Sequence, residues 1–514
     1  MRRDIHSFLK DYTRVQSLPP GEKTALAAPV PAAADWAIVV THGMGQQVHF
    51  ETLEQIAVSL RSAELRARGA ANDIVPRVVR LRDGNGKETE LVRAEMNVTA
   101  SDGQERTVHV YESYWAPLTE GQATLRDVTA FMLESFLRGL WFLVGYRKFD
   151  RWEFGGMKRF AIHFLLSLGK LLAAILIFLA PLALANLLTA GQVVSFLFHR
   201  GAGQEVVLQC LTNDMRWVEI FMGVFGVGAL IFPKLYRAKF LAGRAGFWRA
   251  VRSGLKVLAI LISLGGLLGA FCAELGCFHH IGGPVTGAAR IVVWAAALAE
   301  GLIGRWFLVE YMGDVAIYVT SFKVSRWDEV RDKIKKTVAE VVGGVYGARS
   351  GLDGKGDFLY SKVMVVGHSL GTVISYDVLN WLVLQDELAA MEGRPKDVVG
   401  VSARTKLMLT FGSPLDKVAF LFRTKGNTDE LREAAAAAWQ PLIREYGFRP
   451  AEWVNIWSWF DIVSANLRFY DDPSAAGAGK RVVNKRDPEA FVPLVAHTEY
   501  WNDDLLGDTM YGAL

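Results

Sequence analysis

The stretch Gly367-His368-Ser369-Leu370-Gly371 places a serine between two glycines, where two predicted elements meet. Residues 362–366 before it form a short, apolar, β-branched run, which predicts a buried parallel strand. Residues 372–379 after it predict a helix. A sharp turn between strand and helix exposes a serine hydroxyl, and flanking glycines let the two elements pass closely. The pattern therefore indicates a serine nucleophile, with an ordinary loop as the alternative.

Four further polar blocks follow predicted strands. Thr41-His42-Gly43-Met44-Gly45 ends the strand predicted at residues 35–41. The other three are Thr410–Pro414, Asp461-Ile462-Val463-Ser464 and His497-Thr498-Glu499-Tyr500-Trp501. The strands predicted before these three cover residues 406–411, 452–459 and 481–484. A serine hydroxyl needs a base within hydrogen-bond reach and an acid that orients the base, and these blocks supply candidates for both.

Together with Gly367–Gly371, these blocks resemble the α/β-hydrolase superfamily, and within it the lipase-like serine esterases. The resemblance covers the two flanks of the chain and leaves its middle unmatched. It implies a mostly parallel sheet with helices on both faces. It also implies the chain order serine, acid, histidine, with the acid after the second strand beyond the nucleophile and the base after the next strand.

Carried over residue by residue, the resemblance assigns Ser369 as nucleophile, His497 as general base and then acid, and Asp461 as the orienting carboxylate. Asp416 follows the first of these strands and is the alternative acid, although it could instead cap a helix or form a salt bridge. The order of residues along the chain favours Asp461.

The segment His42-Gly43 resembles the oxyanion loop of the family, so the N–H groups of Met44 and Leu370 are expected to hold the developing oxyanion. Loss of one such donor typically lowers the rate by about 10²–10³-fold. Gly367, His368 and Gly371 are expected to support the turn. His42 and His368 are interpreted as loop neighbours and not as the base. The resemblance implies no metal and no cofactor.

The composition points to a membrane. Of the 514 residues, 51% are hydrophobic, 15 are tryptophan, and the mean hydropathy is +0.20. Four apolar stretches approach the length of a transmembrane helix, which is about 20 residues. They lie at residues 168–188, 217–235, 255–273 and 289–308. Glu300 falls within the fourth, for which an interfacial helix is the alternative.

Lysine and arginine residues orient these spans. They are dense before the first span and between the second and third, and sparse in the other two loops. Basic loops stay on the cytoplasmic side, so an even number of spans keeps both flanks of the chain there. Cys210 and Cys277 then share the opposite side, where they could pair or remain free thiols. The first residues contain no apolar h-region, so we expect no cleaved signal.

The predicted organisation has four parts: an N-terminal extension (1–34), a first part of the α/β domain (35–145), a transmembrane helical insertion (146–312) and a second part (313–514). Further strands are predicted at residues 75–81, 89–96, 107–115 and 315–319, and helices at residues 327–345 and 429–439. Gly313-Asp314, before the last of these strands, is interpreted as structural. Residues 130–152 could lie along the membrane interface or pack as an ordinary helix.

These observations predict a multi-pass protein of a membrane such as the bacterial inner membrane, with a catalytic domain on the cytoplasmic side. The expected activity is cleavage of ester bonds, with the bilayer as partner and a lipid or another acyl ester as substrate. The net charge of +4 gives no reason to expect nucleic acid. A thioesterase, amidase or acyltransferase would use the same residues. A non-catalytic membrane scaffold or sensor on a hydrolase fold, and a channel or transporter, are the alternatives from other classes.

Overall fold

The computed structural model describes residues 34–131 and 309–514, apart from positions 46, 125, 129, 310–311, 320–324, 351–355, 423–441, 443–448, 462, 468–469, 472–480 and 492–495. By its contacts the chain divides into two units: residues 1–165 with 308–514, and residues 166–307. All described residues belong to the first unit. The two flanks of the chain thus fold together as one α/β unit.

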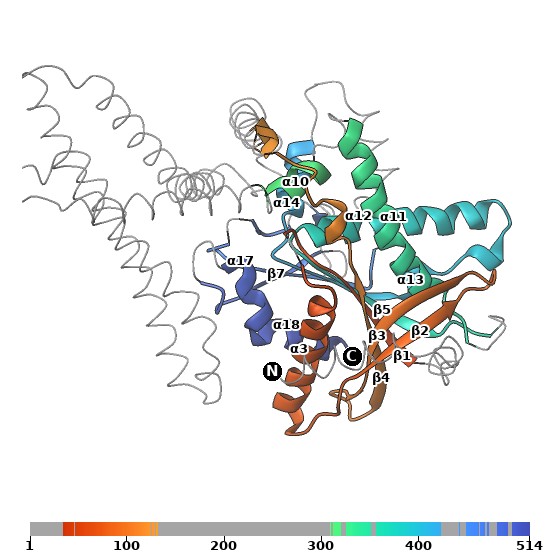
Figure 1. Cartoon of the computed structure of the whole chain (residues 1–514). Helices are drawn as coiled ribbons and strands as arrows, with labels where there is room; N and C mark the ends of the chain where they lie inside the picture. The colour runs from red at the N-terminus through yellow and green to blue at the C-terminus, as the bar shows by residue number, and fades with distance from the viewer. Residues whose placement is uncertain are drawn as a thin grey trace, which may run out of the picture. The chain divides into compact units, whose positions relative to one another are not determined.

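An eight-stranded sheet forms the centre of this unit (Figure 1). Its strands lie in the order β2-β3-β4-β1-β5-β6-β7-β8. The six neighbours from β4 to β8 are parallel, and β3 runs antiparallel to both β2 and β4. Their bounds are β1 (Ala34–Thr41), β2 (Val75–Arg82), β3 (Glu88–Thr99), β4 (Glu105–Ser113), β5 (Tyr360–His368), β6 (Thr405–Phe411), β7 (Glu452–Trp457) and β8 (Val483–Arg486).

Both faces of the sheet are buried, because side chains alternate between two hydrophobic cores. Along β1, Ala37 and Val39 enter one core, whereas Trp36, Ile38 and Val40 enter the other. The same alternation runs along β5. Parallel strands covered on both faces need apolar residues at successive positions, which is the pattern that the sequence shows here.

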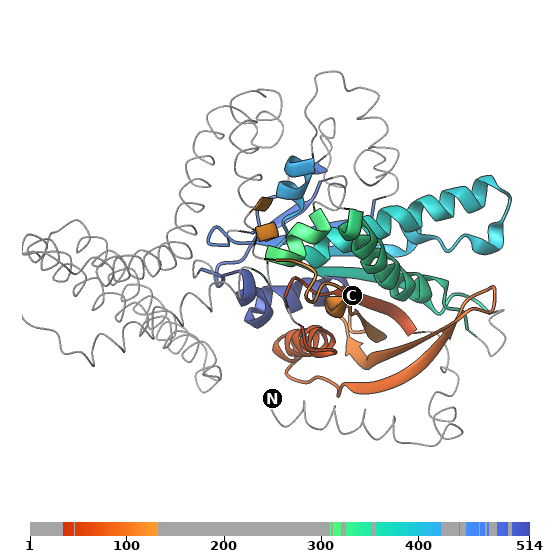
Figure 2. The same ribbon diagram turned by 45° about the horizontal axis from the view of Figure 1, so that its top comes forward.

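Helices supply the other half of each core (Figures 1 and 2). One face carries α3 (Glu51–Arg68) and α18 (Asp504–Ala513), which contact each other. The other carries α10 (Gly313–Val319), α11 (Ser325–Gly347), α12 (Leu370–Met391) and α14 (Leu415–Phe422). Shorter turns are α13 (Val401–Arg404), α17 (Ala496–Glu499) and the 3₁₀ helices η1 (Ala116–Leu118), η5 (Pro395–Asp397) and η9 (Tyr500–Asn502).

The prediction of a mostly parallel α/β sheet with helices on both faces is confirmed, and each predicted strand is present except one. The strand predicted at residues 315–319 is wrong, because this segment belongs to the helix α10. All residues of α10 except Val315 are buried. A helix buried on nearly all sides has no polar face, so its apolar run cannot be distinguished from a buried strand by periodicity.

Several predictions fall outside the described residues. They are the four membrane spans, residues 1–33 of the N-terminal extension, Cys210 and Cys277, most of residues 130–152 and the helix at residues 429–439. Within the described part of the chain, no helix combines the length and the apolar character needed to cross a bilayer.

The chain changes direction within the sheet at β1. From β1 it continues through α3 to the strands on one side of β1, and then crosses to β5 on the other side. Hydrogen-bond register places Thr41 beside Gly367, Gly367 beside Thr410, and Thr410 beside Asn455. The turns that follow β1, β5 and β6 and the loop that follows β7 therefore meet at one edge. Such a switch point is where α/β sheets bind ligands.

The fold gives a direct test of the central core. Ile38 has no exposed surface and lies in the central strand β1. We expect Ile38→Ala to lower the free energy of unfolding by about 2–5 kcal/mol, because the cavity it leaves is enclosed by strands and α3. Val75→Ala, on a residue that is 43% exposed in β2, should change it by about 0.5 kcal/mol or less. Denaturant titration measures both, and equal effects would contradict the assigned core.

Candidate active site

Ser369 sits on a strained turn between β5 and α12. Its backbone has φ 51° and ψ −128°, a conformation that residues with a side chain rarely adopt. The Ser369 N–H donates to the carbonyl of Phe411 at 3.1 Å, and the Ser369 carbonyl accepts from the N–H of Thr372 at 3.0 Å and from its hydroxyl at 2.7 Å. These bonds to β6 and α12 hold the strained conformation in place.

The glycines on either side of Ser369 are required by close backbone packing. A Cβ on Gly371 would collide with the carbonyl oxygens of Thr41 and His42 at the end of β1. A Cβ on Gly367 would come within 2.8 Å of the Cα of Thr372. The structure thus places strand, turn and helix as close together as the Gly-x-Ser-x-Gly spacing predicts.

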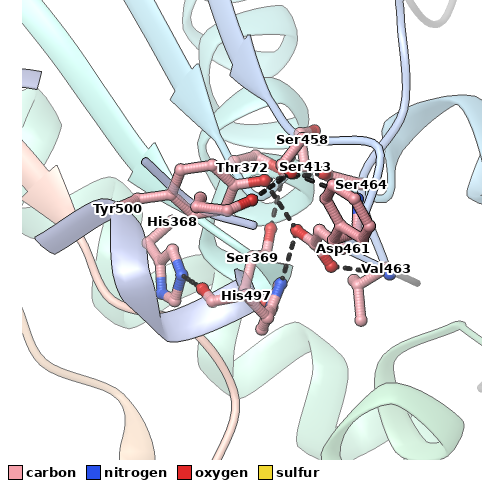
Figure 3. Close-up of polar contacts among 12 residues, drawn as sticks. His368, Ser369, Thr372, Ser413, Ser458, Asp461, Val463, Ser464, His497 and Tyr500 are labelled. Atoms are coloured by element: carbon pink, nitrogen blue, oxygen red, sulfur yellow. Dashed lines mark hydrogen bonds and ion pairs between the residues drawn. The ribbon is translucent and has the colours of Figure 1, made fainter. Parts of the chain in front are cut away.

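The structure brings Ser369, His497 and Asp461 together, and we refer to these three residues as the triad (Figure 3). His497 Nε2 lies 2.7 Å from Ser369 Oγ, and His497 Nδ1 lies 3.0 Å from Asp461 Oδ2. An ionised carboxylate only accepts hydrogen bonds, so Nδ1 carries the proton and Nε2 is left to accept from the serine hydroxyl. This tautomer is the one in which an imidazole can take a proton from the serine.

Asp461 is fully buried but remains ionised. Burial opposes its negative charge, but the charge of His497, the hydrogen bond from His497, the hydroxyl of Ser464 and the N–H of Val463 outweigh it and keep the pKa of Asp461 below its usual value. The Val463 N–H donates to Oδ1 at 2.8 Å, and the hydroxyl of Tyr500 donates to Oδ2 at 3.0 Å. The negative charge that orients His497 is therefore held by several donors.

Asp416, the alternative acid, lies in a different place. It is in the first turn of α14, where its carboxylate is 3.9 Å from the ammonium of Lys417. Burial raises the pKa of Asp416, and the charge of Lys417 only partly offsets this effect. The carboxylate that contacts His497 is Asp461.

The other two histidines near the site are buried, and their ring nitrogens contact backbone groups. Trp115 N–H donates to His42 Nε2 at 3.0 Å, so His42 Nδ1–H donates to the carbonyl of Gly43 at 2.8 Å. His368 Nε2–H donates to the carbonyl of His497 at 3.0 Å. Burial lowers the pKa of His42 to about 4 and that of His368 to about 3. Both are neutral supports, as interpreted from the sequence.

The loop after β1 lies directly against the serine. A Cβ on Gly43 would come within 2.8 Å of the Cβ of Ser369 and of Nδ1 of His368. Among the described residues, neither the Met44 N–H nor the Leu370 N–H donates a hydrogen bond to another group. The loop after β1 and the start of α12 thus each hold an N–H group that makes no hydrogen bond within the described part of the chain.

Three contributors to the site were missed in the sequence. Asp314 Oδ2 accepts from the N–H of Gly45 at 2.7 Å and so ties the loop after β1 to α10; Asp314 was interpreted as structural, but without this partner. Gly412 has φ 61° and packs against the rings of His368 and His497. Tyr500 contacts Asp461. The sequence Phe411-Gly412-Ser413, which begins at the last residue of β6, is a signal for Gly412, but no sequence pattern identifies the partners of Asp314 or Tyr500.

Across the described residues, no group of three or more histidine, cysteine, aspartate or glutamate side chains is placed to hold a metal ion. The chemistry that the triad can perform is nucleophilic attack assisted by a general base. Comparisons with protein-family models, with curated proteins and with solved structures find no significant match for this chain.

The neutral histidines predict a pH dependence of stability. A third buried histidine, His109 of β4, has its pKa lowered by burial to about 3. The unfolded chain takes up protons on these histidines below about pH 6.5, whereas the folded chain does so only near the lowered pKa values of about 4 for His42 and about 3 for His368 and His109. Stability is therefore fully present above pH 6.5 and falls with acidification, by about 2 kcal/mol per histidine between pH 7 and pH 5. In His368→Gln the difference between the unfolding free energies at these two pH values should shrink by about 2 kcal/mol. An unchanged difference would mean that the His368 ring is protonated in the fold.

Proposed function

We propose that this protein is a serine hydrolase of the α/β-hydrolase superfamily that cleaves carboxylic esters. The observation that carries the proposal is the pair of hydrogen bonds in the triad, 2.7 Å from His497 to Ser369 and 3.0 Å from His497 to Asp461. The strained backbone of Ser369 and its place at the switch point of a mostly parallel sheet support it.

In the first half of the reaction, Ser369 Oγ attacks the carbonyl carbon of the ester while His497 Nε2 takes the hydroxyl proton. The negative charge moves to the carbonyl oxygen, to which the N–H groups of Met44 and Leu370 donate hydrogen bonds. The C–O bond to the alcohol then breaks, and the alcohol leaves with the proton from His497. Asp461 stays ionised throughout and stabilises the transient imidazolium.

In the second half, a water molecule takes the place of the alcohol. His497 removes a proton from the water, the resulting hydroxide attacks the acyl carbon, and the bond to Ser369 Oγ breaks as His497 returns its proton to the serine. The products are a carboxylic acid and the free enzyme. A thioesterase, an amidase or an acyltransferase would use the same steps with a different leaving group or acceptor.

A non-catalytic scaffold or sensor on the same fold is the competing proposal. Such a protein has no need of a strained serine, and each strained residue costs about 1–3 kcal/mol. Here the strain falls on Ser369, whose hydroxyl meets the imidazole. The free-energy cost of backbone strain thus falls on the residue whose hydroxyl contacts His497, which favours catalysis over a scaffold role.

The nucleophile can be tested with a fluorophosphonate probe, which reacts covalently with activated serines. We expect the wild-type protein to be labelled and Ser369→Ala to be neither labelled nor active on p-nitrophenyl butyrate. Ser361→Ala, which removes an exposed serine of β5, should behave like the wild type. Equal labelling of wild type and Ser369→Ala would rule out Ser369 as the nucleophile.

We further propose that the enzyme is a multi-pass membrane protein whose catalytic unit faces the cytoplasm and whose substrate is a lipid or another acyl ester that partitions into the bilayer. The support comes from the sequence: four apolar stretches, with basic residues concentrated in alternate flanking segments. A catalytic unit attached to the bilayer works at a high local concentration of lipid esters.

The orientation of the spans has its own test. In a cysteine-free background expressed in intact cells, Gly203→Cys should react with a membrane-impermeant maleimide, because its loop is expected on the non-cytoplasmic side. Gly246→Cys, in the basic segment between the second and third spans, should react only after the cells are permeabilised. The reverse pattern would overturn the proposed orientation.

A further inference from the structure

Tyr500 contacts Asp461 of the triad from within the hydrophobic core. It opens the 3₁₀ helix η9, three residues after His497, and has no exposed surface. Its hydroxyl donates to Asp461 Oδ2 at 3.0 Å, which is the same oxygen that accepts the Nδ1–H of His497 at 3.0 Å. One carboxylate oxygen is therefore shared by an imidazole and a phenol (Figure 3).

The direction of these hydrogen bonds is fixed by the carboxylate. An ionised carboxylate only accepts, so the single proton of the Tyr500 hydroxyl points to Asp461. The Tyr500 oxygen also lies 3.0 Å from Oγ of Ser464, whose single proton is shared between Tyr500 and Asp461 as acceptors. The hydroxyl of Tyr500 thus meets the hydrogen bonds that link Ser369, His497 and Asp461 at one oxygen atom, Asp461 Oδ2.

We propose that Tyr500 is a positioning residue of the triad, which fixes the rotation of the Asp461 carboxylate and limits how strongly its Oδ2 attracts the proton of His497. This inference rests on the proposed function of Ser369, His497 and Asp461. A donor on Oδ2 draws negative charge away from the hydrogen bond to the imidazole. Without that donor, Oδ2 would hold the imidazolium more firmly and the carboxylate would be free to rotate.

Two features suit Tyr500 to this task. Burial, together with the negative charge of Asp461, raises the pKa of Tyr500 well above its usual value, so the phenol stays protonated and remains a donor. Its ring packs edge-on against Phe411 of β6, with 6.2 Å between the ring centroids, in the core that also contains Ala496. The hydroxyl is thus aimed by packing against the sheet.

Tyr500→Phe removes the hydroxyl and keeps the ring, so it tests the hydrogen bond with little change in packing. We expect kcat on p-nitrophenyl butyrate to fall about 3- to 10-fold, with KM within about 2-fold of the wild type. The acidic limb of the pH profile should move to higher pH by about 0.5 unit, because the imidazolium is held more firmly. The rate of fluorophosphonate labelling, followed from about pH 5 to pH 9, should show the same displacement.

The matched control is Tyr511→Phe in α18. Tyr511 lies in the same core, and its hydroxyl donates a hydrogen bond of 2.9 Å to the carbonyl of Thr99, away from the triad. We expect this variant to keep the kcat and the pH profile of the wild type. Thermal unfolding of both variants measures the purely structural cost of losing a tyrosine hydroxyl.

The outcomes separate the two proposals. A wild-type protein that neither reacts with the probe nor hydrolyses the ester would overturn the proposed function itself. An active wild type, with Tyr500→Phe unchanged in kcat and in its acidic limb, would overturn only the role of Tyr500. A lower Tm and lower kcat with an unmoved acidic limb would show a structural role, and would equally overturn the proposal.

Discussion

The geometry of the triad depends on the parallel pairing of β1, β5, β6 and β7. Their hydrogen-bond register brings the carboxyl ends of the strands to one edge, with Thr41, Gly367, Thr410 and Asn455 side by side. The polar residues in the segments that follow these four strands therefore lie close together at this edge of the sheet. A shift of one residue in a single pair would turn every side chain of that strand to the opposite core, so burial on both faces protects the register. The buried cores therefore stabilise the fold and fix the relative positions of serine and acid.

The same burial has opposite electrostatic consequences for neighbouring groups. It leaves His42 and His368 neutral, because their ring nitrogens meet backbone groups that cannot neutralise a positive charge. Asp461 is just as deeply buried, but donors from His497, Val463 and Tyr500 surround its carboxylate and keep it ionised. In the buried interior, the hydrogen-bond partners of a titratable side chain decide whether that side chain is charged. The site thus contains one fixed negative charge next to the imidazole of His497.

The strain at Ser369 is maintained by contacts that lie outside the Gly-x-Ser-x-Gly motif. Bonds to Phe411 and Thr372 hold its backbone, and Gly43 packs directly against it. The loop that contains Gly43 is in turn tied to α10 by Asp314, 269 positions away from Gly45 in the sequence. Both flanks of the chain therefore contribute to the turn. This mutual dependence explains why a sequence interrupted by a long insertion can still form one site.

The sequence by itself determined all but one of the predicted strands, the serine turn, and the order of Ser369, Asp461 and His497 along the chain. Apolar β-branched runs mark strands buried on both faces, and a serine between glycines at the end of such a run predicts a sharp turn into a helix. Only the tertiary structure decided the position of β1 between β4 and β5, the helical state of residues 315–319 and the choice of Asp461 over Asp416 as the partner of His497. It alone also decided the contacts of Tyr500 and Asp314. The physical reason is that periodicity reports which faces of a segment are buried, whereas strand order and side-chain partners depend on groups that are far away in the chain.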